Sequence, residues 1–280
     1  MKRQNGLAAG RVLLAMPIVA MIGIGTATAD FDAGLAAYQR GEFRSAKAEW
    51  EKAAEQGDDR ANFNLGILYS EGRGVAIDHE MAAELWTKAA EKGNADAMHN
   101  LALAHLTGDG VEQSHDMAAD WLNRAAEAGS VRSAYALGKM HEFGLGVDKD
   151  QTKAADFIQK AANMGFDRAQ YNMGKRFRDG NGVVKDPEAA ATWFVAAARQ
   201  GYPQAQRNAG VRLLTGDGIQ EDRVQGLMFL ILAARAGVDS AEGLRDSFVG
   251  DVSEDERDSA EEMADNWTPT PSMGMAGGKN

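Results

Sequence analysis

Six glycines recur at a fixed interval of 36 residues, and this period constrains the fold more than any other feature of the chain. They are Gly57, Gly93, Gly129, Gly165, Gly201 and Gly237. The five blocks within residues 58–237 align with no insertion or deletion. Self-similarity at a period of roughly 20–50 residues is typical of solenoids, which stack one small unit repeatedly. Such chains usually present a surface to a partner, so the period favours a binding protein.

Each block has the pattern of two antiparallel helices. Its first half carries apolar residues at helical spacing, as at Ala61, Leu65 and Leu68. Two glycines follow, and glycine tolerates the positive φ that commonly ends a helix. A second helix then begins at a residue type that caps helix N-termini. This capping column is Asp78, Ser114, Asp150, Asp186 and Asp222. We therefore expect an all-α solenoid.

The N-terminal residues have the pattern of a secretory signal peptide. Lys2, Arg3 and Arg11 are basic, residues 12–24 form an uncharged apolar run, and residues 27–29 make a small-x-small cleavage site. We expect removal of residues 1–29; the alternative is an uncleaved anchor helix. No other stretch approaches the ~20 apolar residues that span a bilayer, so no stable membrane insertion is expected after cleavage. With no cysteine for lipid attachment, the predicted location is the periplasm, with secretion as the alternative.

The remaining segments depart from the repeat. Residues 30–57 form a shorter unit with a tight turn, which predicts an N-terminal capping hairpin like that of tetratricopeptide repeats. After Gly237 the period is lost, and residues 238–268 predict C-terminal capping helices, one of which opens with a capping box at Ser253. Residues 269–280 contain two prolines and several glycines, so we expect a disordered tail.

Acidic residues outnumber basic ones. The formal net charge is −11 and becomes more negative once the three basic residues of the leader are removed. This balance disfavours binding to nucleic acid. Residues 239–267 alone hold eleven acidic and two basic residues. That segment is either a solubilising cap or a contact for a basic partner.

The repeated columns resemble those of the Sel-1-like repeat family. The matching runs are residues 61–66, 69–75, 118–121 and 125–129, and the resemblance extends over about residues 31–267. It implies a right-handed α-α superhelix of antiparallel helix pairs in 36-residue repeats. It also implies an adaptor, either a scaffold or a regulator of an envelope complex or sensor, that binds protein partners in its concave groove. Some cysteine-rich relatives are reported as penicillin-binding or β-lactamase-like, with a disulfide in each repeat, and this gives the alternative function of an enzyme acting on β-lactams or cell-wall peptides. The present chain has no cysteine.

An amide column and a set of basic residues are the candidate partner-binding positions. The amides are Asn64, Asn100, Asn172 and Asn208, which either bond the backbone of an extended peptide or stitch neighbouring repeats together. The basic residues lie on the first helices of the later repeats: Arg132, Lys139, Arg168, Lys175, Arg176, Arg178, Arg207 and Arg212. They form either a binding stripe for an acidic peptide, a carboxyl terminus or a glycan, or a solvated face paired with nearby carboxylates.

Catalytic and metal-binding signals are weak. The five histidines lie between residues 79 and 141, but equivalent positions on neighbouring repeats are about 10 Å apart, too far for shared coordination. No short catalytic motif or nucleotide-binding fingerprint occurs. We therefore expect no enzyme activity, no metal and no cofactor. The capped ends and acidic charge favour a monomer.

Overall fold

Residues 25–271 are described by the computed structural model, and within this range all regular secondary structure is helical. Most of the expected leader and the part of the expected disordered tail beyond residue 271 lie outside the described residues. The all-α solenoid predicted from the 36-residue period is confirmed. In residues 25–271 no helix is both long and apolar enough to cross a membrane.

Five helix pairs repeat with identical length and spacing. The first helices have 13 residues each: α3 (Asp59–Glu71), α5 (Ala95–Thr107), α7 (Val131–Phe143), α9 (Asp167–Asp179) and α11 (Pro203–Thr215). The second helices also have 13 residues each: α4 (His79–Glu91), α6 (His115–Glu127), α8 (Gln151–Asn163), α10 (Pro187–Arg199) and α12 (Arg223–Arg235). Each helix packs mainly on its neighbours in sequence, so the repeats form a linear stack.

Further helices flank the stack at both ends. At the start, α1 (Gly25–Gln39) and α2 (Phe43–Glu55) form a hairpin in which the Trp50 indole donates to the Phe31 carbonyl at 3.2 Å. At the other end lie α13 (Ala241–Phe248), the 3-10 helix η1 (Val249–Asp251) and α14 (Glu254–Asp265). The capping box at Ser253 is present, and α14 packs against α12.

The second helices begin where the capping column predicts. Asp78, Ser114, Asp150, Asp186 and Asp222 each accept a hydrogen bond from a backbone N–H in the first turn. Such a cap satisfies a donor that has no partner within the helix and stabilises it by about 1 kcal/mol. The first helices follow the same rule at Asp58, Asn94 and Ser130, but Phe166 and Tyr202 occupy the N-cap positions of α9 and α11 without capping.

The glycine pair in each loop has two functions. The first glycine, such as Gly144, ends the first helix in a left-handed conformation. The second, such as Gly146, has φ +62° and lies against the backbone of the preceding repeat, where a Cβ would collide with the His115 carbonyl. The second glycine therefore allows the loop of one repeat to touch the start of the second helix in the repeat before it.

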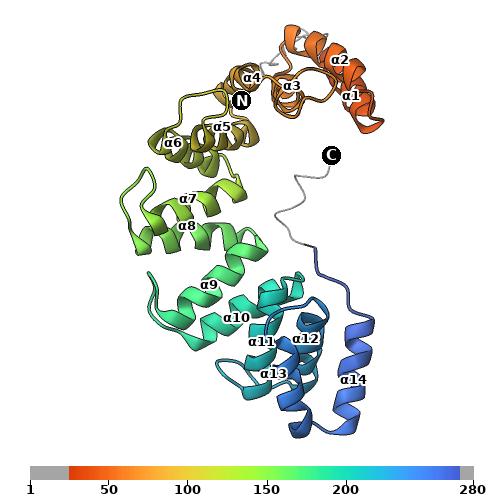
Figure 1. Cartoon of the computed structure of the whole chain (residues 1–280), viewed down its shortest axis with the longest axis vertical. Coiled ribbons are helices and arrows are strands. Elements are labelled where there is room, and N and C mark those ends of the chain that lie inside the picture. The colour runs from red at the N-terminus through yellow and green to blue at the C-terminus, as the bar shows by residue number, and fades with distance from the viewer. Residues whose placement is uncertain (1–24, 272–280) are drawn as a thin grey trace, which may run out of the picture.

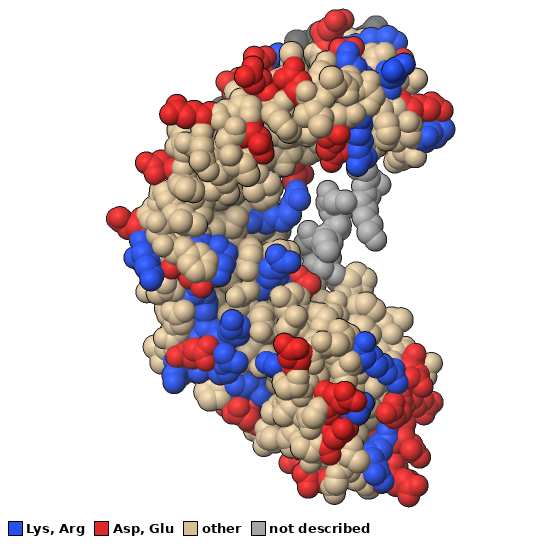
Figure 2. All heavy atoms as spheres, in the orientation of Figure 1, with Lys and Arg blue, Asp and Glu red and all other residues tan. Residues whose placement is uncertain are grey.

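The stack bends into an arc that is open on one side (Figure 1). In its upper half α5 lies on the inner side of the arc and its partner α6 on the outer side. The space-filling view shows the same arc, with its concave side open between the two ends (Figure 2). This arrangement exposes the first helices toward the concavity.

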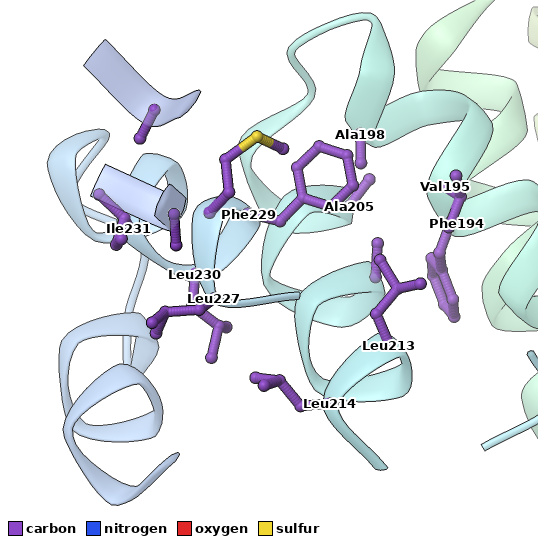
Figure 3. Packing of buried hydrophobic residues seen from close by; sticks show 14 of the residues in the cluster. Phe194, Val195, Ala198, Ala205, Leu213, Leu214, Leu227, Phe229, Leu230 and Ile231 are labelled. Carbon is purple, nitrogen blue, oxygen red and sulfur yellow. The ribbon is translucent and has the colours of Figure 1, made fainter. Parts of the chain in front are cut away.

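The largest hydrophobic cluster holds the C-terminal end together. In Figure 3 the Phe229 ring of α12 lies beside Ala198 of α10 and Ala205 of α11. Phe194, Phe229 and Leu230 are almost completely buried. The small alanines allow the helices to approach closely enough for the aromatic ring to fill the space between them. Ala260 and Ala264 of α14 close this cluster from the other side of α12.

Candidate partner-binding surface

The exposed side of the first helices, here called the first-helix surface, carries most of the predicted site residues. The amide column lies on it, but its members do not act alike. The Asn172 amide donates to the Tyr135 hydroxyl of the preceding repeat at 3.1 Å and to the Arg168 carbonyl at 2.8 Å. The Asn208 amide bonds only its own helix. Asn64 and Asn100 make no side-chain hydrogen bond within residues 25–271. Only one of the four therefore stitches two repeats.

Two of the predicted basic residues are buried rather than presented on the surface. The Arg176 side chain is 5% exposed, pairs with Glu142 at 2.9 Å and donates to the Asn181 carbonyl. Arg212 occupies the equivalent position one repeat later and donates to the Asp217 carbonyl at 3.1 Å. Each guanidinium holds the loop that follows its own helix. The sequence therefore overestimated the exposed basic set.

Four more of the basic residues have partners within the chain. Arg132 pairs with Asp96, one repeat earlier, at 2.9 Å, and Lys139 pairs with Glu142 at 2.8 Å. Arg178 pairs with the adjacent Asp179, and Arg207 contacts the Asp239 carbonyl. Burial acts to raise the pKa of Glu142, but Lys139 and Arg176 lie against it and hold its pKa below the ordinary value. The ion pairs of Arg132, Lys139 and Arg178 reduce the net positive charge that a partner meets.

Arg168 and Lys175 are the two predicted cations whose side chains form neither an ion pair nor a hydrogen bond to a backbone carbonyl within the described residues. They lie seven residues apart on α9, two turns along the same side of the helix. The Lys175 ammonium lies 5.8 Å from the centre of the Tyr171 ring. Both side chains therefore keep their charge available to an incoming group.

Three tyrosines surround these cations, and the sequence reasoning missed them. Tyr135 contacts Phe166 with the rings edge to face, and Tyr171 stacks on Tyr202 with the ring centres 4.9 Å apart. Burial raises the pKa of the Tyr135 and Tyr202 hydroxyls, and the nearby Arg168 guanidinium opposes the rise. The missed signal was the first-helix N-cap column, which changes from capping residues to aromatics at residues 166 and 202. We call Arg168, Asn172, Lys175 and the three tyrosines the basic-aromatic cluster.

A hollow of about 430 Å³ opens on the same surface between α3 and α5. Phe63, Ile67, Trp86 and Leu103 supply its apolar part, while Asn100 and Arg132 line it with polar atoms. The Trp86 indole donates to the Phe63 carbonyl at 3.3 Å, so its polar end is satisfied and its ring faces the hollow. Leu103 is 44% exposed, so its side chain can contact a group that enters the hollow.

Three of the five histidines pack in the stack or bond its loops, whereas His79 and His115 are the exposed first residues of α4 and α6. His99 is buried with its Nδ1 2.8 Å from the Ser133 hydroxyl, and burial lowers its pKa to about 4. His105 and His141 bond the carbonyls of Glu112 and Asp148 in the loops that follow their helices. In the described part of the chain no three metal-ligating side chains cluster together.

Charge is distributed unevenly over the molecule. In Figure 2, Lys and Arg side chains gather over the middle of the arc, and Asp and Glu side chains gather over the end that carries α14. Some acidic residues of that end serve local structure, since Arg235 of α12 pairs with Glu261 and Asp265 of α14. The middle of the arc and the end that carries α14 therefore offer different surfaces to a charged partner.

These features define an α-solenoid of repeated helix pairs with an exposed face of amide, aromatic and basic side chains. The chain belongs to the Sel1 repeat family. The family model for the Sel1 repeat matches residues 50–58, 59–94, 95–130, 131–166, 167–202 and 203–238. Each of the five full matches spans one helix pair. It begins one residue later than the corresponding 36-residue block, which starts directly after the glycine. Sel1 repeat proteins are generally protein-interaction modules.

Two solved structures share this fold. A protective antigen of uropathogenic Escherichia coli with an SLR fold is 28% identical, with a TM-score of 0.75, and the match covers 85% of this chain and 54% of that one. A Sel1 repeat protein from Oxalobacter formigenes is 33% identical, with a TM-score of 0.72 and coverage of 80% and 66%. The present chain thus spans about half to two thirds of the length of these relatives. Comparison with curated proteins gave no match.

Proposed function

We propose that this chain is a periplasmic interaction module that binds a protein partner on the first-helix surface, as a scaffold or regulator of an envelope complex. One observation supports the binding surface most strongly. Arg168 is exposed and Lys175 is half-buried, and neither has an ion-pair partner among the described residues, although the chain carries a net charge of −11. The chain has enough carboxylates to pair with both cations, yet neither cation is paired within residues 25–271. Their free charge favours a partner with acidic groups.

Crosslinking in cells tests the proposed surface. A photoreactive amino acid at Leu103 lies on the first-helix surface, and the same group at Asp120 lies on the exposed side of α6. We expect a defined protein adduct from position 103 and none from position 120. Adducts from position 120 alone, or equal adducts from both positions, would contradict the proposal.

The periplasmic location rests on the leader pattern and on where helix packing begins. Phe31 is buried against Trp50, two residues beyond the expected cleavage point, so cleavage before Asp30 leaves this contact in place. Arg60 also lies over the Phe31 ring at 4.1 Å. We expect protein purified from the periplasmic fraction to have the mass of a chain that begins at Asp30. A periplasmic protein that retains Met1 would show that the leader is not cleaved.

A further inference from the structure

The hollow and the basic-aromatic cluster lie on the same face at equivalent repeat positions. Asn100 and Leu103 line the hollow, and the residues two repeats later in the same columns are Asn172 and Lys175. Arg132 also lines the hollow, and Arg168 follows it by one repeat. One bound chain that crosses the first helices therefore meets both sites in succession.

The hollow is open because one column carries a small residue at this repeat alone. The column is Leu68, Ala104, Met140, Arg176 and Arg212. Ala104 lines the hollow, whereas the long Met140 side chain is buried at the equivalent place one repeat later. Two repeats later the buried Arg176 and its partner Glu142 occupy that place. The first-helix surface thus has an apolar opening between α3 and α5.

The basic-aromatic cluster is suited to a carboxylate. Arg168 and Lys175 provide two positive charges, and the Tyr202 hydroxyl interacts with the Arg168 side chain. Charged hydrogen bonds from arginine and lysine to carboxylate are roughly twice as strong as neutral ones. Lys175 replaces the leucine that lines the hollow, so this position of the surface changes from apolar to cationic along the stack.

The spacing of the two sites sets the spacing in the ligand. Neighbouring first helices are close enough for side chains to bond across them, as Arg132 does with Asp96 at 2.9 Å. Taking about 10 Å, the usual distance between neighbouring helices, as the step from one first helix to the next puts α5 and α9 about 20 Å apart. An extended chain advances about 3.3 Å per residue, so about six residues separate the two contacts. The Asn100 amide, which has no partner in the described chain, lies beside this path and can bond peptide backbone.

We propose that the first-helix surface binds an extended acidic peptide with an apolar side chain in the hollow and a carboxylate at Arg168 and Lys175, about six residues apart. This inference rests on the proposed function, because it specifies the partner of the same surface. The proposed ligand is a peptide. A polyanion or free phosphate would bind the cations alone and would need no apolar contact in the hollow.

Fluorescence anisotropy with synthetic peptides tests the spacing. The probes are fluorescein-labelled peptides of glycine and serine that carry one leucine and one pair of glutamates, two, six or ten residues apart. We expect the six-residue spacing to bind most tightly. We also expect replacement of its leucine by alanine to weaken binding several-fold, because the leucine side chain is buried in the complex. Equal binding of all three spacings, or no binding at about 1 mM protein, would overturn the proposal.

Two variants separate the sites. Ala104→Met fills the hollow with the residue that the chain itself uses at position 140, and it should abolish the preference for leucine over alanine. Arg168→Glu with Lys175→Glu should weaken binding at least about tenfold and remove most of its salt dependence. The matched control is Lys88→Glu with Lys153→Glu, which makes the same charge change at exposed positions on second helices. Leu103→Glu is a second test of the hollow at an exposed position, in case Ala104→Met disturbs folding.

The outcomes separate this inference from the proposed function. If crosslinks from position 103 persist while Ala104→Met and the double charge reversal leave peptide binding unchanged, the surface binds a partner but the peptide class is wrong. If position 103 gives no adduct, the proposed function itself fails. Binding of inorganic phosphate or heparin that competes fully with the peptide and ignores the leucine would identify an anion site instead.

Discussion

Single substitutions in a repeated column give each repeat its own role. The Leu68, Ala104, Met140, Arg176 and Arg212 column supplies core packing, an opening, core packing again and then two guanidinium groups that bond loop carbonyls. The backbone is equivalent at all five positions, so the side chain alone decides the role. Conserved geometry with variable chemistry is what allows a solenoid to differentiate its surface.

His99 illustrates how such a position affects stability with pH. Burial is the main cause that lowers its pKa to about 4, with Arg132 nearby also lowering it and Asp96 opposing. The folded protein therefore binds fewer protons at this site than the unfolded chain between the ordinary pKa of about 6.5 and about 4. Protonation of His99 therefore does not affect the free energy of unfolding above about pH 6.5. As the pH falls from about 6.5 to about 4, the free energy of unfolding decreases by up to about 3 kcal/mol.

We expect His99→Phe to remove this contribution, since Phe63 shows that the column accepts phenylalanine. Urea unfolding at pH 7.5 and pH 4.5 measures the free energy of unfolding for both proteins. The wild type should lose about 2 kcal/mol more than the variant over this interval. The carboxylates titrate in both proteins, so the difference isolates His99. An identical loss in the two proteins would show that His99 is protonated without cost.

At the scale of the helix and its loop, close contact between repeats depends on positions that tolerate no Cβ. Gly129 and Gly146 both have positive φ, at +93° and +62°. A Cβ at Gly129 has nothing within 4 Å, whereas a Cβ at Gly146 would collide with the backbone of His115. The two glycines therefore separate the cost of a left-handed conformation from the cost of a lost contact.

We expect Gly129→Ala to destabilise the protein by about 1 kcal/mol, which is the cost of a left-handed conformation for an ordinary residue. Gly146→Ala should cost at least about 2 kcal/mol more, because the loop must move away from the start of α6. Thermal and urea unfolding of the two variants supply the comparison. Equal destabilisation would mean that the loop shifts freely and that the repeats are not tightly joined there.

Helices and their limits follow from the sequence, because glycine and capping residues act locally. The period, the caps at Asp78 and its equivalents and the left-handed glycines needed no tertiary information. The site was less predictable. Burial of Arg176 depends on Glu142, 34 residues away, and the hollow depends on the absence of a long side chain at Ala104. Tyr135 and Tyr171 follow the ring-bearing Phe63 and His99 in their column, so their type alone indicates packing, whereas Tyr202 breaks the pattern of the N-cap column. Their contacts with Arg168 and Asn172 are what place them at the site.

At the scale of the whole molecule, an open stack must protect its last hydrophobic face. The second helix α12 is buried on nearly all sides, with Gly226 to Ile231 all buried, whereas earlier second helices expose one side. The cause is α14, which packs on α12 and adds ion pairs from Arg235. Past α14, the Thr270 N–H donates to the Arg199 carbonyl at 2.8 Å and ties the chain back to α10.

This arrangement predicts that the stack depends on α14 for solubility. Ala260 is completely buried and Ser259 beside it is exposed, so Ala260→Glu and Ser259→Glu place the same charge on two sides of one helix. An unpaired buried carboxylate costs several kcal/mol, more than the contacts of one short helix supply, so α14 should detach in Ala260→Glu. Phe229 and Met228 would then meet water, and stacks that lose a terminal unit associate through the exposed face. We expect Ala260→Glu to bind the dye ANS and to elute as a larger species on size exclusion, while Ser259→Glu elutes with the wild type as a monomer. If both variants elute as the wild type does and neither binds the dye, α12 does not need α14 to stay folded and soluble.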